Sequence, residues 1–237
     1  MTIPAETVQL PARGWRIDRT HAFWAGALCW LGFAVMVWAV ATDRTHGLDD
    51  TGLLFWRGSD GLVPRGPEML LEAVRDVTAL GGVLLRNIFA LGAIVALLFL
   101  RLRREAVLFA ATVIAGWLLN SAIKHLVGRP RPEIVPHLTE AGGASFPSGH
   151  SFNSAVVYIA MALAFATLSA RQSVRLTVIG IAIAASLAIA WSRVWLGVHW
   201  PSDVVAGWLG GAGWAFAAAA LLQRPADSIA DGTTRPA

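Results

Sequence analysis

The chain has 237 residues, a length that could make one or two soluble domains. Its composition excludes them, because hydrophobic residues make up 56% of the chain and charged residues only 14%. A soluble domain typically carries about 25% charged residues. The single cysteine, Cys29, allows neither an intrachain disulfide nor a thiolate metal cluster. The sequence therefore predicts an integral membrane protein.

The formal net charge of +4 could suggest a nucleic-acid partner. All but one of the 19 basic residues are arginines, however, and they fall in short clusters between apolar runs. Clusters of this kind are typical of the cytoplasmic ends of membrane helices, and no basic soluble domain is present. We expect the lipid bilayer as a partner and no nucleic acid.

Uncharged stretches predict six transmembrane helices, since a spanning helix needs about 20 apolar residues. The predicted spans are about 20–42, 77–100, 106–123, 151–170, 176–192 and 204–223. The second contains Arg86, whose side chain we expect to reach the interface from a point near the start of the helix. The predicted fold class is all-α integral membrane. We expect a single domain over 1–223 and a flexible tail over 224–237.

Arginine clusters set the predicted orientation. They are Arg13, Arg16 and Arg19 before the first span; Arg101, Arg103 and Arg104 after the second; Arg171 and Arg175 after the fourth; and Arg224 after the sixth. With six spans, all of these segments lie on one side of the membrane, which we expect to be the cytoplasmic side. Both termini are then cytoplasmic.

Residues 43–76 join the first two spans on the outer side. We expect a loop followed by a helix that begins at Pro67, with acidic residues in its early turns and apolar residues at helical spacing. Two interpretations fit this pattern: an interfacial amphipathic helix, or an ordered connector packed on the bundle.

Polar residues gather at the predicted outer ends of the last four spans. Lys124, the only lysine, closes the third span. The other members are Arg129 and Arg131 after the third span, Pro147-Ser148-Gly149-His150 before the fourth, Ser192-Arg193 at the end of the fifth, and His199 and Asp203 at the entrance to the sixth. The polar residues lie at the ends of the third and fifth spans and at the beginnings of the fourth and sixth. Since successive spans cross the membrane in opposite directions, all of these ends lie at one membrane surface.

The cations Lys124, Arg131 and Arg193 favour an anion, and arginine favours phosphate because its planar donors match phosphate oxygens. Ser148 and Gly149 lie where a helix begins, so free backbone N–H groups face the same anion.

Two histidines beside a phosphate site suggest complementary roles, in which one attacks phosphorus and the other protonates the leaving oxygen. Asp203 follows His199 by four residues and can orient its ring. No carboxylate pair or His/Cys cluster supplies metal ligands, so the cations themselves must stabilise the charge of the transition state.

Three clusters can be distinguished: Lys124 to Pro132, Pro147 to His150 and Ser192 to Asp203. They resemble the motifs of the type 2 phosphatidic acid phosphatase (PAP2) family, the membrane relatives of vanadium haloperoxidases. The family motifs are K-x6-RP, PSGH and SR-x5-H-x3-D, and all three are present with matching spacing, from Lys124 to Asp203. The resemblance implies that His199 is the nucleophile and forms a phosphohistidine, that Asp203 orients it and that His150 is the general acid. It also implies that Lys124, Arg131, Ser148, the Gly149 amide and Arg193 hold the phosphate, without a metal or cofactor.

The resemblance further implies an integral-membrane lipid phosphatase, expected in a bacterial cytoplasmic (inner) membrane with its site facing the exterior. The substrate is expected to be a polyprenyl diphosphate such as undecaprenyl diphosphate, phosphatidate or phosphatidylglycerol phosphate. Two alternatives are a lipid phosphotransferase that uses the same histidines, and a non-hydrolytic transporter of anions or lipid phosphates. Transport is disfavoured because the apolar runs lack the paired broken helices of transporters. The sequence leaves the oligomeric state open.

Two further expectations concern single residues. Arg129 is expected to be a surface neighbour of the site, since Arg131 holds the motif position. Gly207 and Gly211 form a small-x3-small pair, which we expect to serve close helix packing.

Overall fold

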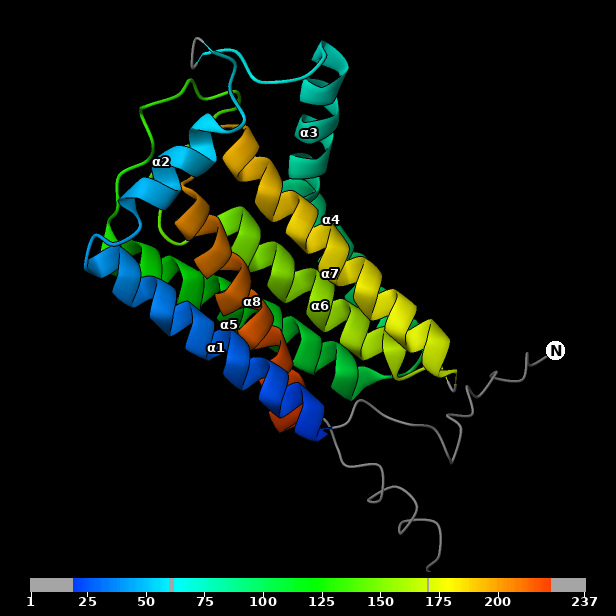
Figure 1. Ribbon diagram of the computed structural model, residues 1–237. Helices are drawn as coiled ribbons and strands as arrows, with labels where there is room; N and C mark the ends of the chain where they lie inside the picture. Colours follow the sequence, from blue (N-terminus) through cyan, green and yellow to red (C-terminus); the bar gives the residue numbers. More distant parts are fainter. Residues whose placement is uncertain (1–18, 60–61, 170, 223–237) are drawn as a thin grey trace, which may run out of the picture.

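Long helices lie side by side along most of the chain (Figure 1). The computed structural model describes residues 19–59, 62–169 and 171–222, and within these ranges the regular structure is helical. The helices are α1 (Arg19–Ala41), α2 (His46–Leu54), α3 (Glu68–Leu80), α4 (Val83–Phe99), α5 (Arg103–Val127), α6 (Gly149–Ala166), α7 (Gln172–Trp195) and α8 (Pro201–Leu222). The clusters predicted at Arg13, Arg16 and Arg224, and the tail 224–237, lie outside the described residues.

Six membrane crossings account for all of the helices except α2. Among the described residues, α1, α5, α6, α7 and α8 are each long and apolar enough to span a membrane alone. Helices α3 and α4 pass the same test together, although they are bent by 48° at the break between them. The all-α, six-span prediction is confirmed, with one span made of two helices.

The predicted second span, 77–100, is divided by a break near its start. The helix stops at Leu80 and restarts at Val83, and the break contains Gly81 and Gly82. A side chain on Gly81 would collide with Ile189 of α7 and would lie 2.9 Å from Ser154 Oγ of α6. The glycine therefore lets the break pack closely against these two helices. The absence of broken helices was one argument against a transporter, and this break weakens it. The described residues contain a single broken helix pair of this kind.

The expectation for Arg86 was wrong, because its side chain is buried rather than extended to the interface. Its Nη1 donates a hydrogen bond to the Gly81 carbonyl at 3.2 Å. A carbonyl in a helix break has no intrahelical donor, so the arginine satisfies a backbone group inside the protein.

Counting uncharged residues misplaced several helix ends. Helix α5 runs Arg103–Val127 rather than 106–123, and α7 runs Gln172–Trp195 rather than 176–192. Charged residues lie in the terminal turns of both helices, so a count of uncharged residues ends each helix too early. Helix α6 begins near the predicted position but ends at Ala166, short of 170.

The 43–76 connection holds more structure than the sequence indicated. Helix α2 was not predicted, whereas α3 begins directly after Pro67 as expected. Val74 of α3 is buried in one cluster with Trp195, Leu196 and Val198. The packing on the bundle that the second interpretation predicted for this segment is therefore present.

The centre of the bundle is the contact between α6 and α8. A side chain on Gly207 would lie 2.7 Å from the Ser148 carbonyl oxygen, and one on Gly211 would collide with the Phe152 carbonyl oxygen. Small residues allow this approach, which in a membrane is driven by close packing rather than by the hydrophobic effect. The role predicted for this glycine pair is confirmed.

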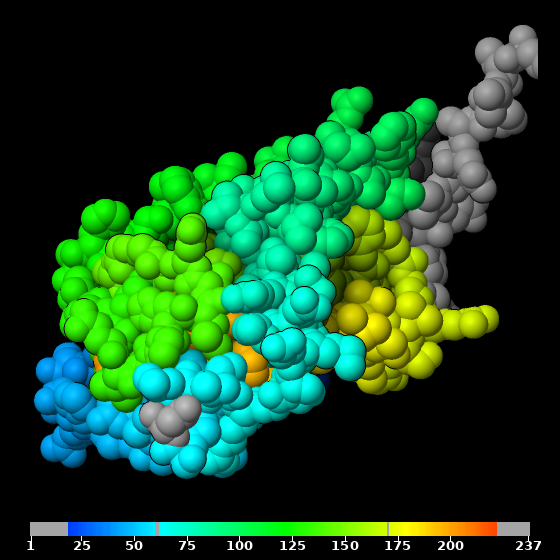
Figure 2. Space-filling view, turned by 90° about the horizontal axis from the view of Figure 1, so that it is seen from above, coloured from blue at the N-terminus to red at the C-terminus, as the bar shows by residue number. Residues whose placement is uncertain are grey.

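Connecting segments cover the end of the bundle where α5 and α7 finish and α6 and α8 begin. Figure 2 looks onto this end and shows the 55–80 segment in cyan and the 128–148 segment in green lying across it. A small orange area from the part of the chain near residue 200 is visible between them (Figure 2). Of the residues predicted to form the site, Arg131 and Ser148 lie in the 128–148 segment.

We predict that Gly211→Ala lowers the thermal stability of the detergent-solubilised protein, because the added methyl group meets the α6 backbone. Overpacking of this kind typically costs about 1–3 kcal/mol. Gly180→Ala is the matched control, since Gly180 is an exposed helical residue with open space around its Cα. Equal melting temperatures for the two variants would contradict the close α6–α8 contact.

Candidate active site

The ends of four helices and the 128–148 loop form the site. Lys124 lies in the last turn of α5, Gly149 begins α6 and Arg193 lies in the last turn of α7. His199 lies in the short connection between α7 and α8, and Asp203 in the first turn of α8. The predicted gathering of the three clusters at one end of the bundle is confirmed.

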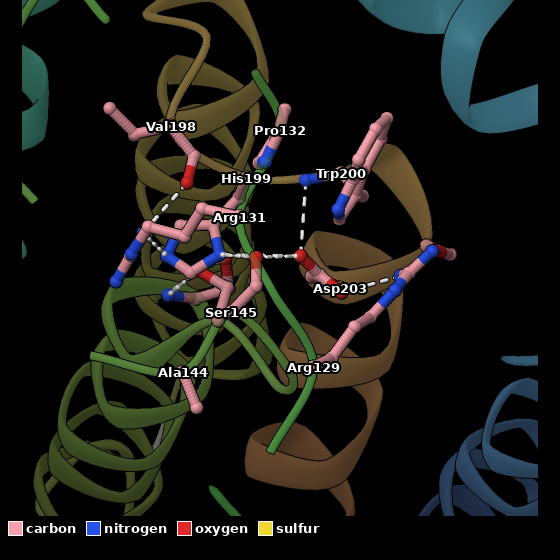
Figure 3. Close-up of polar contacts among 12 residues, drawn as sticks. Arg129, Arg131, Pro132, Ala144, Ser145, Val198, His199, Trp200 and Asp203 are labelled. Carbon is pink, nitrogen blue, oxygen red and sulfur yellow. Dashed lines mark hydrogen bonds and ion pairs between the residues drawn. The ribbon is translucent and has the colours of Figure 1, made fainter. Parts of the chain in front are cut away.

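His199 is fully enclosed, with its two ring nitrogens in different surroundings (Figure 3). Nε2 lies 3.1 Å from Arg131 Nη1, a donor only. Nδ1 lies 3.2 Å from Ser145 Oγ, which in turn donates to Asp203 Oδ2. Nδ1 must therefore carry the proton and donate it to Ser145, which leaves a lone pair on Nε2.

The Ser145 hydroxyl links His199 to Asp203. The direct separation between His199 Nδ1 and Asp203 Oδ2 is 3.5 Å, which is long for a hydrogen bond. The contact between His199 and Asp203 therefore runs through Ser145, a residue that the sequence analysis did not select.

Burial lowers the pKa of His199 to about 4. Asp203 opposes this change by favouring the charged ring, while the nearby charges of Arg131 and Arg193 favour the neutral ring. The imidazole is therefore neutral at physiological pH, which is the state that a nitrogen nucleophile requires.

Asp203 has no exposed surface and is fully engaged. Its Oδ1 accepts a hydrogen bond from Arg129 Nη1 at 2.7 Å, and its Oδ2 accepts from Ser145 and from the Trp200 backbone N–H at 3.1 Å. Arg129 was expected to be a surface neighbour; instead its side chain is 17% exposed and forms a salt bridge with Asp203.

The three cationic side chains predicted to bind phosphate donate hydrogen bonds to backbone carbonyls and to one hydroxyl group. Lys124 Nζ donates to the Ala144 carbonyl at 2.6 Å, and Arg131 donates to those of Gly142, Gly143 and Val198. Arg193 Nη1 donates to Thr78 Oγ1 at 2.9 Å, while its buried Nε has no hydrogen-bond partner in the described part of the chain. Since no described carboxylate forms a salt bridge with these three side chains, their charge is available to an anion.

The start of α6 contributes backbone donors. Ser148 is the N-cap, and its Oγ accepts from the Ser151 hydroxyl at 2.9 Å and from the Ser151 N–H. Gly149 follows as the first helical residue, whose N–H has no partner within the helix. A side chain on Gly149 would lie 3.5 Å from Lys124 Cε, so the start of α6 lies close to the Lys124 side chain.

His150 lies one residue further along α6, beside the α3–α4 break. A side chain on Gly81 would lie 3.1 Å from His150 Cδ2. The ring is close enough to Arg193, His199 and Arg131 to interact with their charges. Both histidines therefore belong to one polar site, which His150 reaches from α6 and His199 from the connection between α7 and α8.

Sequence reasoning missed three residues that contact the site, Asp49, Thr78 and Ser145, and it gave Arg129 only a surface position. Asp49 lies in α2 and Thr78 in α3, and no sequence motif marks either residue. Arg129 and Ser145 lie in the same loop as predicted site residues, so their position in the sequence indicated that they could lie near the site. The sequence did not indicate that they bond to Asp203. Among the described residues, no three His, Cys, Asp or Glu side chains converge as metal ligands.

The fold and site define a multi-pass membrane protein with a buried histidine in a cationic site. The sequence profile of the PAP2 superfamily matches residues 104–227. The chain is 31% identical over 183 residues to phosphatidylglycerophosphatase B of Bacillus subtilis (strain 168), a match that covers 75% of this chain and 84% of that one. This protein therefore belongs to the PAP2 superfamily, and it is a membrane phosphatase.

Two further proteins are similar to this chain, one in sequence over part of its length and one in fold. The chain is 36% identical over 118 residues to lipid A 1-phosphatase of Rhizobium etli, a match that covers 46% of each chain. The crystal structure of a transmembrane PAP2-type phosphatidylglycerolphosphate phosphatase from Bacillus subtilis has the same fold. It superimposes with a TM-score of 0.71 at 24% identity, covering 90% of this chain and 98% of that one.

The pKa of His199 predicts a pH-dependent difference in stability. Between pH about 6.5 and about 4, the unfolded chain binds a proton on this histidine that the folded chain does not bind. The free energy of unfolding therefore decreases as pH falls through this range. We expect His199→Gln to lose less stability than wild type over the same range, as measured by thermal unfolding in detergent.

The matched control is His125→Gln, because His125 is an exposed histidine at the same end of the bundle. This variant should follow the wild-type curve. If His199→Gln also follows it, the neutral state assigned to His199 is wrong.

Proposed function

We propose that this membrane protein hydrolyses the terminal phosphate of a lipid phosphomonoester or diphosphate through a phosphohistidine on His199. One observation carries the proposal: His199 directs its unprotonated Nε2 toward Arg131, within a site whose three cations have no carboxylate partner. A neutral nucleophile surrounded by free positive charge suits attack on an anionic phosphoryl group.

The proposed reaction has two steps. His199 Nε2 forms a bond to phosphorus while the bond from phosphorus to the lipid oxygen breaks, and His150 gives a proton to that oxygen. Water then attacks the phosphohistidine and gives its proton to His150, and the N–P bond breaks to release inorganic phosphate. Lys124, Arg131, Arg193 and the Gly149 amide stabilise the negative charge on the phosphoryl oxygens in both steps.

Phosphatidylglycerol phosphate is the favoured substrate, because the phosphatase named for it matches three quarters of this chain. Phosphatidate and undecaprenyl diphosphate share the same reacting group and remain the competing substrates. The position of the site at the ends of the membrane helices suits them all, since a lipid tail can stay in the bilayer while its phosphate enters.

We further propose that the site faces the exterior of a bacterial cytoplasmic membrane. The described arginine clusters at 101–104 and 171–175 lie at the opposite end of the bundle from the site, as the positive-inside rule requires of cytoplasmic loops.

The first test measures phosphate release by purified protein in detergent with excess EDTA. It compares phosphatidylglycerol phosphate, phosphatidate and undecaprenyl diphosphate, with His199→Ala as the blank and His125→Ala as the matched control. We expect release that survives EDTA, persists in His125→Ala and is lost in His199→Ala. Release that requires a divalent metal, or that persists in folded His199→Ala, would contradict the mechanism.

The covalent intermediate gives a second prediction. A lipid labelled with ³²P in its terminal phosphate should transfer label to the protein in a form that is stable to alkali and labile to acid, because a phosphoramidate bond has this behaviour. His150→Ala should retain the label longer than wild type, since water attack loses its general base. Transfer of label to an added alcohol or sugar in preference to water would favour the phosphotransferase alternative.

A further inference from the structure

A second buried carboxylate lies behind Asp203, and one guanidinium joins the two. Arg129 donates from Nη1 to Asp203 Oδ1 at 2.7 Å and from Nη2 to Asp49 Oδ2 at 2.8 Å. Asp49 is 1% exposed and lies on α2, far from Asp203 in the sequence. The two carboxylates therefore share one cation, and neither is exposed to water.

Helix α8 completes the arrangement. The Ser202 backbone N–H donates to Asp49 Oδ1 at 2.8 Å, and the Ser202 hydroxyl donates to Asp49 Oδ2 at 2.7 Å. Arg129 also donates to the Ser202 hydroxyl oxygen at 2.7 Å. Asp49 thus accepts from one backbone N–H in the first turn of α8, where a negative charge is stabilised by the helix dipole. Asp203 follows Ser202 directly and lies in the same first turn of α8.

Electrostatics favour a charged Arg129. Burial works against its charge, but Asp203 and Asp49 outweigh this effect and raise the pKa of Arg129. The guanidinium also lies 5.4 Å from the centre of the Trp200 ring, in the residue next to His199. Its planar donors reach both carboxylates at once, which the single nitrogen of a lysine would do less well.

We propose that Arg129 is a positioning residue for phosphate hydrolysis, and that Asp49, Arg129 and Asp203 form a buried bridge that holds Asp203 toward Ser145 and His199. Arg129 makes no direct contact with His199, so it acts through Asp203. The inference depends on the proposed function for its reaction. It extends that function by assigning a role to α2, a helix outside the PAP2-matched residues 104–227.

The bridge has a predictable effect on His199, because the charge of Arg129 partly balances that of Asp203. Without Arg129, the negative charge of Asp203 would favour the protonated ring more strongly, and the pKa of His199 would rise from about 4. The charged and titratable groups around His199 are Asp203 from α8, Arg131 from the loop, Arg193 from α7 and His150 from α6.

The test compares Arg129→Gln, Arg129→Lys and Asp49→Asn with wild type, using kcat, KM and the pH dependence of kcat/KM for hydrolysis of the best lipid substrate. Loss of a hydrogen-bond partner of a metal-ligating residue typically costs about 10–100-fold in activity, and we expect the same order for a partner of Asp203. We expect Arg129→Gln to lose kcat by this amount with KM within about twofold of wild type. The acid limb of its kcat/KM profile should move to higher pH.

The other variants refine the result. Arg129→Lys should recover part of kcat and return the acid limb toward wild type, since it keeps the charge. Asp49→Asn should lose less kcat than Arg129→Gln, because Asp203 keeps its cation. The matched controls are Asp50→Asn, the next residue of α2 outside the bridge, and Arg44→Gln, an exposed arginine; both should match wild type.

Inhibition by orthovanadate, which mimics the phosphoryl group in the transition state, separates positioning from phosphate binding. Its inhibition constant should rise in Arg131→Gln and stay within about twofold of wild type in Arg129→Gln. Wild-type kcat and an unmoved acid limb in Arg129→Gln would overturn the inference. A lower kcat explained only by less folded protein, with the acid limb unmoved, would also overturn it.

If Arg129→Gln does not fold, as judged by its thermal transition, Arg129→Lys and Asp49→Asn decide the matter by the same readouts. If wild type hydrolyses no lipid phosphate, the proposed function fails. If wild type is active but the three variants match it, only the bridge fails.

Discussion

The burial of Asp203 is the constraint on which the site depends. An ionised carboxylate without access to water costs several kcal/mol unless charges and hydrogen bonds compensate it. Here the compensation comes from Arg129, Ser145 and the Trp200 N–H. These groups belong to the 128–148 loop and to the connection before α8, so stabilising one carboxylate fixes the two segments that carry Arg131 and His199.

Helix packing and site geometry are coupled at the α6–α8 contact. Gly207 lets α8 approach the Ser148 carbonyl, and the Ser148 N–H donates to the Asp203 carbonyl at 3.0 Å. The turn that carries Asp203 is therefore bonded to the N-cap of the helix that carries Gly149 and His150. Any change in the spacing of these two helices would move both histidines relative to each other.

The cations of the site that are paired with carboxylates and those that are not lie in different places. Arg129 is neutralised by two carboxylates, whereas Lys124, Arg131 and Arg193 bond to neutral oxygens. Positive charge is therefore retained on the side of His199 that bears the lone pair. This division distinguishes two arginines separated by one proline in the chain: Arg129 is paired with carboxylates, whereas Arg131 bonds to neutral groups and keeps an unbalanced positive charge.

The sequence by itself determined the membrane class, the six crossings and the motif residues that converge on one membrane surface, because apolar run length, charge and residue spacing are local properties of a chain. Only the tertiary structure revealed the α3–α4 break, the burial of Arg86, the serine between His199 and Asp203, and the bridge from Arg129 to Asp49. The break depends on the close approach of Gly81 to α6 and α7, and the bridge joins residues of α2, the loop and α8. Such contacts depend on which helix faces pack together, and hydropathy and motif spacing do not encode that choice.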